Sequence, residues 1–198
     1  MATSDTIYGD GTFYSCPSLF YQLYTFHAIV DAKMYPLVYN LLPAKNQTVY
    51  TKLLTLLKDI CQQHQLKLPP RTIFLDYEVA IRHAAHAVFP GIKAKGCLFH
   101  YTQCIWRKVQ DTGLQVPYKE NNDINKLVRR TAVLPLLPVN DLEDVWFYAL
   151  EDLEEADTNT STLAFTDYIT SYWAESNGHL WNHYQTDGPT TWKAGTVS

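Results

Sequence analysis

The spacing of apolar residues in the first part of the chain predicts three strands followed by a helix. Residues 6–13, 19–30 and 35–42 are rich in aromatic and aliphatic side chains, and the connections between them are short. Such runs predict an antiparallel meander. Residues 47–65 instead place an apolar side chain every three or four positions, which predicts a helix with Asn46 as its N-cap.

A buried strand that ends in an acid organises the next part of the chain. Residues 72–76, Thr-Ile-Phe-Leu-Asp, are too few for a helix and predict a central strand. Residues 79–89 have helical spacing, residues 92–99 predict another short strand, and residues 100–110 are again helical. The order β-β-β-α-β-α-β-α predicts an α/β fold with a mixed sheet, in which the first strand lies beside the fourth.

The character of the sequence changes after residue 111, where strand patterns give way to helical spacing. Residues 112–180 predict a helical insertion or extension, and the stretch after it is rich in aromatics without clear periodicity. Helices are expected at residues 123–133, 142–153 and 163–174. We therefore divide the chain into a sheet domain at 1–111, a helical part at 112–180 and a final segment at 181–198.

Composition and charge limit the possible classes of protein. The 198 residues are 46% hydrophobic and 14% aromatic, which indicates a folded protein rather than a disordered one. A formal net charge of −4 excludes a uniformly basic nucleic-acid-binding protein, so contact with DNA would need a local patch. Four irregularly spaced cysteines without a leader sequence predict a reduced intracellular compartment. No apolar run is long enough to span a membrane.

A modest group of basic residues is the candidate for such a patch. It consists of Lys93, Lys95, Arg107 and Lys108, close to the predicted sheet edge. These side chains could contact phosphates. A solvated helix face explains them equally well.

Two aspartates follow strand-like runs and are the candidate metal ligands. Asp76 ends the central strand, and Asp10 follows the first strand in a predicted Gly-Asp-Gly turn. Acids at the carboxyl ends of neighbouring strands meet at one edge of a sheet, and carboxylate oxygens suit Mg²⁺ or Mn²⁺. The alternative is that Asp10 is a turn residue and that Asp76 caps the following helix. Glu78 is either a supporting acid near Asp76 or an ordinary acid of the first helical turn.

Cysteine and histidine positions suggest a possible zinc site. Cys97 and His100 form a C-x-x-H pair, and Cys104 shares a helix face with His100. The alternative is a buried cysteine on a strand followed by a histidine at a helix start. His83 and His86 lie near one face of the helix at 79–89, where a solvated pair is the simpler interpretation.

Several ordered segments resemble a known family, the Mutator-like element (MULE) transposase domains. The resemblance covers roughly residues 9–104. Its segments are Asp10-Gly11-Thr12-Phe13, Pro17, Phe20 to Tyr24, Tyr35 to Leu42, Asp76, Val88-Phe89-Pro90 and Cys97-Leu98-Phe99-His100.

The resemblance implies a ribonuclease-H-like fold and DDE-type, metal-dependent cleavage and transfer of DNA strands. By position, Asp10 is the first catalytic acid and Asp76 the second, and both would bind Mg²⁺ or Mn²⁺. Cys97 and His100 occupy the family's C-x-x-H, for which a structural Zn²⁺ is a possible role. The family further implies double-stranded DNA (transposon ends and target) as partner, possible homo-oligomers and a nuclear location.

The third catalytic acid is not identifiable by this resemblance. In relatives with a FLYWCH-type zinc finger, a W-N-x-Y segment and a T-N-N motif precede the glutamate. Here Trp181-Asn182-His183-Tyr184 and Gly188-Pro189 match the start, whereas residues 190–193 depart from it, and Glu175 lies too early. We therefore expect a partial copy with weak or absent activity. The alternatives are a non-catalytic, transposase-derived module that binds DNA or protein, and an unrelated ribonuclease-H-like nuclease.

Overall fold

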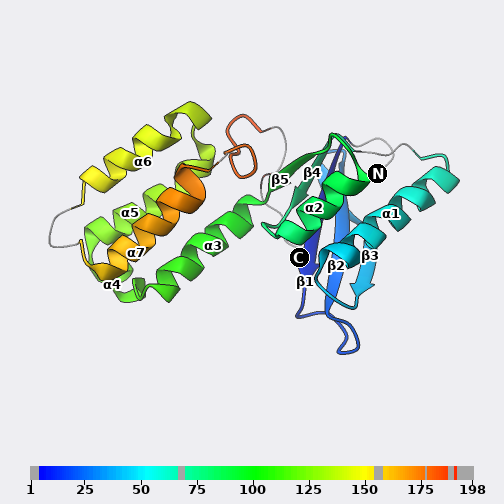
Figure 1. The fold of residues 1–198 in the computed structure, drawn as a ribbon, viewed down its shortest axis with the longest axis horizontal. Coiled ribbons are helices and arrows are strands. Elements are labelled where there is room, and N and C mark those ends of the chain that lie inside the picture. The colour runs from blue at the N-terminus through cyan, green and yellow to red at the C-terminus, as the bar shows by residue number, and fades with distance from the viewer. Residues whose placement is uncertain (1–4, 67–69, 154–157, 177, 187–189, 191–198) are drawn as a thin grey trace. The chain divides into compact units, whose positions relative to one another are not determined.

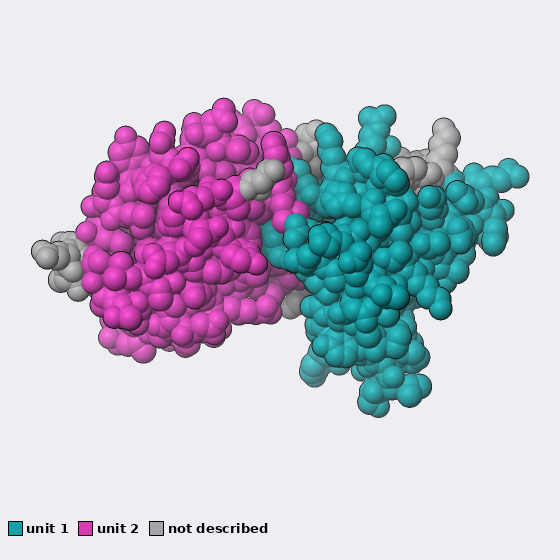
Figure 2. All heavy atoms as spheres, in the orientation of Figure 1, with its two compact units in different colours: residues 1–97, 192–198 teal, residues 98–191 magenta. Residues whose placement is uncertain are grey.

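The chain divides into two compact units, which Figure 2 shows in different colours. The computed structural model describes residues 5–66, 70–153, 158–176, 178–186 and 190. One unit comprises residues 1–97 and 192–198, and the other comprises residues 98–191. The first unit contains the sheet, and the second is helical. The helix that follows the last strand therefore belongs to the helical unit, although we had placed it with the sheet.

Five strands form one mixed sheet within the described residues (Figure 1). Its order is β3-β2-β1-β4-β5. The pairs β1–β2 and β2–β3 are antiparallel, whereas β4 is parallel to both β1 and β5. The predicted meander and the predicted contact between the first and fourth strands are therefore confirmed. The bounds are Thr6–Thr12 for β1, Gln22–Val30 for β2, Lys33–Leu42 for β3, Thr72–Leu75 for β4 and Lys93–Gly96 for β5.

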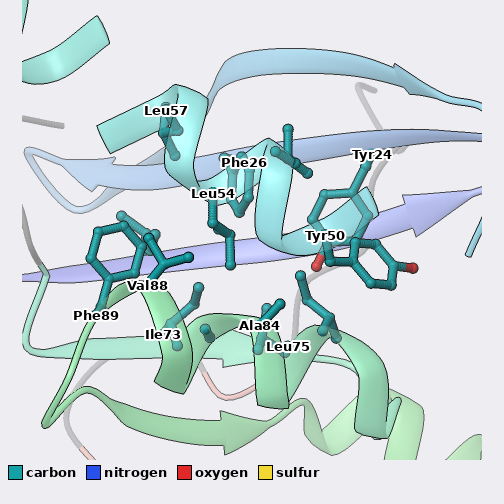
Figure 3. Packing of buried hydrophobic residues seen from close by; sticks show 14 of the residues in the cluster. Tyr24, Phe26, Tyr50, Leu54, Leu57, Ile73, Leu75, Ala84, Val88 and Phe89 are labelled. Atoms are coloured by element: carbon teal, nitrogen blue, oxygen red, sulfur yellow. The ribbon is translucent and has the colours of Figure 1, made fainter. Parts of the chain in front are cut away.

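Two helices, α1 (Gln47–Gln63) and α2 (Val79–Val88), pack on the same face of this sheet. The side chain of Asn46 accepts a hydrogen bond from the Val49 backbone N–H (3.0 Å), so the predicted N-cap of α1 is confirmed. Figure 3 shows the resulting core, in which alternate residues of β2 and β4, such as Tyr24 and Phe26 or Ile73 and Leu75, face the helices. Its members include Ile7, Tyr24, Phe26, Ile73 and Leu75 from the strands and Tyr50, Leu54, Leu57, Ala84 and Val88 from the helices.

The predicted turn at Gly9-Asp10-Gly11 is wrong, because β1 continues through it to Thr12. These residues pair with Tyr24 to Phe26 of β2. The glycines are explained by packing instead of by a turn. A Cβ added at Gly9 would lie 2.7 Å from the Tyr24 hydroxyl oxygen, so only glycine lets that side chain lie against β1.

The strand predicted at residues 92–99 is also shorter than expected. It ends at Gly96, and α3 (Leu98–Asp111) begins two residues before His100. The backbone N–H of Cys97 still donates to the Leu75 carbonyl (2.9 Å), which is where pairing with β4 stops. An apolar Leu-Phe pair suggested a continuing strand, but here it forms the first turn of a helix.

The second unit confirms the helical interpretation of the region after residue 111. Its centre is aromatic: the ring of Tyr101 stacks on Trp181 (centroids 5.7 Å apart) and meets Trp173 edge-on (4.6 Å). No helix in the described part of the chain is long and apolar enough to cross a membrane. The elements after α3 are α4 (Gln115–Glu120), α5 (Asn122–Val133), η1 (Leu134–Leu136), η2 (Val139–Asp141), α6 (Leu142–Glu151), α7 (Thr160–Ile169) and the π-helical η4 (Thr170–Ala174).

Candidate functional site

The two aspartates lie at corresponding places on neighbouring parallel strands. The last paired residues of β1 and β4 are Tyr8 and Phe74, whose rings stack with centroids 5.0 Å apart. Asp10 and Asp76 each lie two residues beyond this pair. Because β1 and β4 run in the same direction, both acids lie toward the same edge of the sheet. Asp10 is buried inside the β1 ladder opposite Thr25, whereas Asp76 is the first residue after β4.

The charges of both acids affect the pKa of the buried Tyr24 hydroxyl. Burial raises the pKa of Tyr24 well above its usual value, and the negative charge of Asp76 raises it further, followed by Tyr50, Asp10 and Glu78. Charges influence a buried group most over short distances, because the protein interior screens them less than water does.

A backbone hydrogen bond orients the carboxylate of Asp76. The N–H of Glu78 donates to Asp76 Oδ1 at 3.2 Å. The N-cap position of α2 belongs to Glu78, not to Asp76, so Asp76 is not the cap that one alternative interpretation expected. The bond instead closes a turn of the type that aspartate forms with the backbone two residues ahead. One carboxylate oxygen of Asp76 is thereby engaged by the protein.

Two side chains hold Glu78, one from α1 and one from the connection before it. The Tyr50 hydroxyl donates to Glu78 Oε2 (2.9 Å) and accepts from Gln22 Nε2 (2.7 Å). Lys45 Nζ lies 3.3 Å from the same Glu78 oxygen. Burial raises the pKa of Glu78 above its usual value, while the Tyr50 hydrogen bond and Lys45 act in the opposite direction. We call Gln22, Tyr50 and Glu78 the polar chain.

The two carboxylates are the candidate ligands for a hard divalent cation. Among the described residues, no three His, Cys, Asp or Glu side chains are grouped so that they could hold a metal ion. Mg²⁺ nevertheless binds proteins through one or two carboxylates and completes its octahedron with water and substrate phosphates. Asp10 and Asp76 supply two carboxylates of that kind at one sheet edge.

The structure does not bring the predicted zinc ligands together within one unit. Cys97 is fully buried directly after β5, and His100 is the third residue of α3, so the two lie in different units. A zinc site at this pair stays a prediction. His83 and His86 are both exposed on α2, in agreement with a solvated pair.

The predicted basic group is divided between the two units. Lys93 pairs with Thr72 at the start of β4, at the opposite end of that strand from Asp76. Burial lowers the pKa of Lys95, and the charge of Lys93 lowers it further. Arg107 and Lys108 belong to α3, where Lys108 Nζ lies 5.1 Å above the Tyr168 ring centroid.

The segment suspected of leading to the third acid lies in the helical unit. Trp181 is buried, and Asn182 Nδ2 donates to the Leu137 carbonyl at 2.7 Å. Glu175 is exposed at the end of η4. Gly188-Pro189 and residues 191–193, on which the departure from the family's pattern depends, lie outside the described residues.

The neutral polar residues that surround the two aspartates were not identified from the sequence. Tyr50 has no role in the sequence-based predictions, and Gln22 appears there only within the segment from Phe20 to Tyr24 that resembles the family. The available signal was weak: a tyrosine on the buried face of a helix needs a partner for its hydroxyl. The partner itself, Glu78, lies 28 residues farther along the chain.

A comparison with protein families adds an independent observation. The family model of the MULE transposase domain matches residues 6–104, which is half of the chain. The match starts with β1, includes both aspartates and the C-x-x-H pair, and ends within α3. No curated protein matches the chain.

Proposed function

Because the chain belongs to the MULE transposase domain family, we propose that its sheet unit is a ribonuclease-H-like core with a divalent-metal site for DNA strand cleavage and transfer. Asp10 and Asp76 are the proposed metal ligands. The observation that carries the proposal is their equivalent position, two residues beyond the Tyr8–Phe74 pair of two parallel strands. The sheet order β3-β2-β1-β4-β5, with antiparallel pairing only among β1, β2 and β3, is in keeping with that fold.

In this proposal, the protein holds the two metal-binding carboxylates in different ways. Asp10 is fixed by the ladder of β1, and Asp76 by the Glu78 N–H on its Oδ1. Mg²⁺ or Mn²⁺ bound there would polarise the phosphodiester and lower the pKa of a bound water. The part of the surrounding residues is to hold the two carboxylates at fixed positions around the ion.

The expected substrate is double-stranded DNA, by the family to which the chain belongs, and the expected location is the nucleus. With a net charge of −4, the chain would meet DNA through a local surface. Two carboxylates are fewer than the three acids of a DDE site. We therefore expect this chain to bind the ion and to cleave DNA weakly or not at all.

The test is calorimetric titration of Mn²⁺ into the wild type and into Asp10→Asn and Asp76→Asn. Asparagine keeps the shape of the side chain and removes its charge. Both variants are expected to bind Mn²⁺ at least about tenfold more weakly. Asp59→Asn, at an exposed position of α1, is the matched control and should bind as the wild type does.

The same proteins are then incubated with labelled duplex DNA and Mn²⁺. Any cleavage should disappear in Asp10→Asn and Asp76→Asn. A wild type that binds no Mn²⁺, or variants that bind it unchanged, would refute the metal site. DNA binding that survives in both variants without Mn²⁺ binding would favour the non-catalytic module.

A further inference from the structure

We propose that Tyr50 and Glu78 are positioning residues for Asp76, and that the polar chain fixes the direction of its carboxylate. The inference rests on the proposed metal site and goes beyond it, because neither residue is an expected ligand there. It concerns side chains from β2, α1 and the connection between β4 and α2.

The Tyr50 hydroxyl both accepts and donates a hydrogen bond. It accepts one hydrogen bond from Gln22 and donates one to Glu78. Tyr50 is fully buried, and the Glu78 side chain is only 14% exposed, so water competes little for these bonds. A phenol held by a donor and an acceptor has a fixed orientation. Glu78 Oε2 is fixed in turn, because Lys45 approaches the same atom.

The orientation of Glu78 is passed to Asp76 through the backbone. A fixed Glu78 side chain limits the rotation of its own peptide unit, and that N–H is the donor to Asp76 Oδ1. With Oδ1 held, the direction of Oδ2 is set as well. This is the arrangement by which a hydrogen-bonded carboxylate presents one oxygen to a metal ion.

The other end of the polar chain lies against β1, beside Asp10. A Cβ added at Gly11 would lie 2.7 Å from Gln22 Oε1, so the Gln22 carboxamide sits on the backbone next to Asp10. The polar chain therefore connects the segment that carries Asp10 with the segment that carries Asp76. Such a connection can hold the spacing of two metal ligands.

Tyr24 provides a matched comparison within the same core. Its ring lies edge-on to that of Tyr50, with centroids 5.6 Å apart, and Figure 3 shows the two side chains next to each other. Both are almost completely buried. The Tyr24 hydroxyl, however, has no hydrogen-bond partner among the described residues. Removing each hydroxyl thus changes the same kind of side chain, but only one change breaks the polar chain.

The experiment measures Mn²⁺ affinity by calorimetry in Tyr50→Phe, Tyr24→Phe, Glu78→Ala and Glu78→Gln. All are compared at a temperature at which circular dichroism shows each protein folded. Tyr50→Phe and Glu78→Ala are expected to bind about tenfold more weakly, as is usual when a ligand loses its support. Tyr24→Phe should bind as the wild type does. Glu78→Gln keeps an acceptor for Tyr50 and should recover most of the affinity that Glu78→Ala loses.

Each outcome decides the matter. Wild-type affinity in both Tyr50→Phe and Glu78→Ala would overturn the positioning role while leaving the metal site intact. If Tyr50→Phe does not fold, the Glu78 pair decides: equal affinities of the alanine and glutamine variants overturn the inference. A wild type that binds no Mn²⁺ refutes the proposed metal site, and the inference with it.

Discussion

Replacement of Tyr50 by phenylalanine should destabilise the sheet unit, whereas the same replacement at Tyr24 should not. Tyr50→Phe removes a hydrogen bond from Gln22 and a hydrogen bond to the carboxylate of Glu78. A neutral bond contributes about 1 kcal/mol and a bond to a charged group about 1.5–3 kcal/mol. Glu78 keeps Lys45 as a partner, which offsets part of the loss. The expected decrease in the free energy of unfolding is about 2 kcal/mol.

Tyr24→Phe removes a buried hydroxyl that has no partner among the described residues. An unsatisfied buried polar group is unfavourable by about 1–3 kcal/mol, so its loss should leave stability unchanged or raise it by roughly 1 kcal/mol. Both substitutions remove one oxygen atom from an almost fully buried tyrosine. The two variants should therefore differ by about 2–3 kcal/mol, mainly because of hydrogen bonding and not because of packing.

The assay is urea unfolding followed by circular dichroism and by tryptophan fluorescence. Four of the five tryptophans, Trp106, Trp146, Trp173 and Trp181, belong to the helical unit, so fluorescence reports mainly on that unit and circular dichroism on both. A double-mutant cycle with Glu78→Ala should give a coupling of about 1–2 kcal/mol to Tyr50→Phe. Equal stabilities of Tyr50→Phe and Tyr24→Phe, or a coupling near zero, would refute the reasoning.

Three further changes test the fold and the zinc prediction. Asn46→Ala removes the N-cap bond of α1 and should lower the free energy of unfolding by about 1 kcal/mol in urea; no change would contradict the cap. Gly96→Ala places a Cβ against the Tyr77 ring and should lower stability by about 1–3 kcal/mol, which the added change Tyr77→Ala should partly relieve; an additive double mutant would contradict the clash. If Cys97 and His100 bind zinc, elemental analysis of the purified protein should show it, and Cys97→Ser and His100→Ala should each lose it. Equal zinc in all three proteins would end that assignment.

Strands whose pattern reflects burial could be predicted, and the position of Asp76 with them. The run Ile73 to Leu75 is apolar because both of its faces are covered in the sheet. A run of this length is too short for a helix, so it predicts a strand. The order of elements then required that the first strand lie beside the fourth, and this in turn placed the two aspartates near each other.

The local sequence predicted the wrong structure where a residue is required by packing against a neighbouring strand. Glycines on both sides of Asp10 are the usual mark of a turn. In β1, however, Gly9 makes room for the Tyr24 side chain and Gly11 for Gln22. Their reason lies in a neighbouring strand and cannot be read from the local sequence. The partner of the Tyr50 hydroxyl is equally non-local, because it comes from a connection on the far side of β4.

The two aspartates are held by different means, and this difference has a consequence for the site. Asp10 lies inside a ladder that also stabilises the sheet, so changes in β2 that displace it should reduce stability at the same time. Asp76 lies beyond its strand and depends on the Glu78 N–H. Its orientation can therefore change while the sheet stays intact. Substitutions around Asp10 should lower metal affinity and stability together. Glu78→Gln should retain most of both, because the glutamine side chain keeps the hydrogen bond from Tyr50 and loses only the charge.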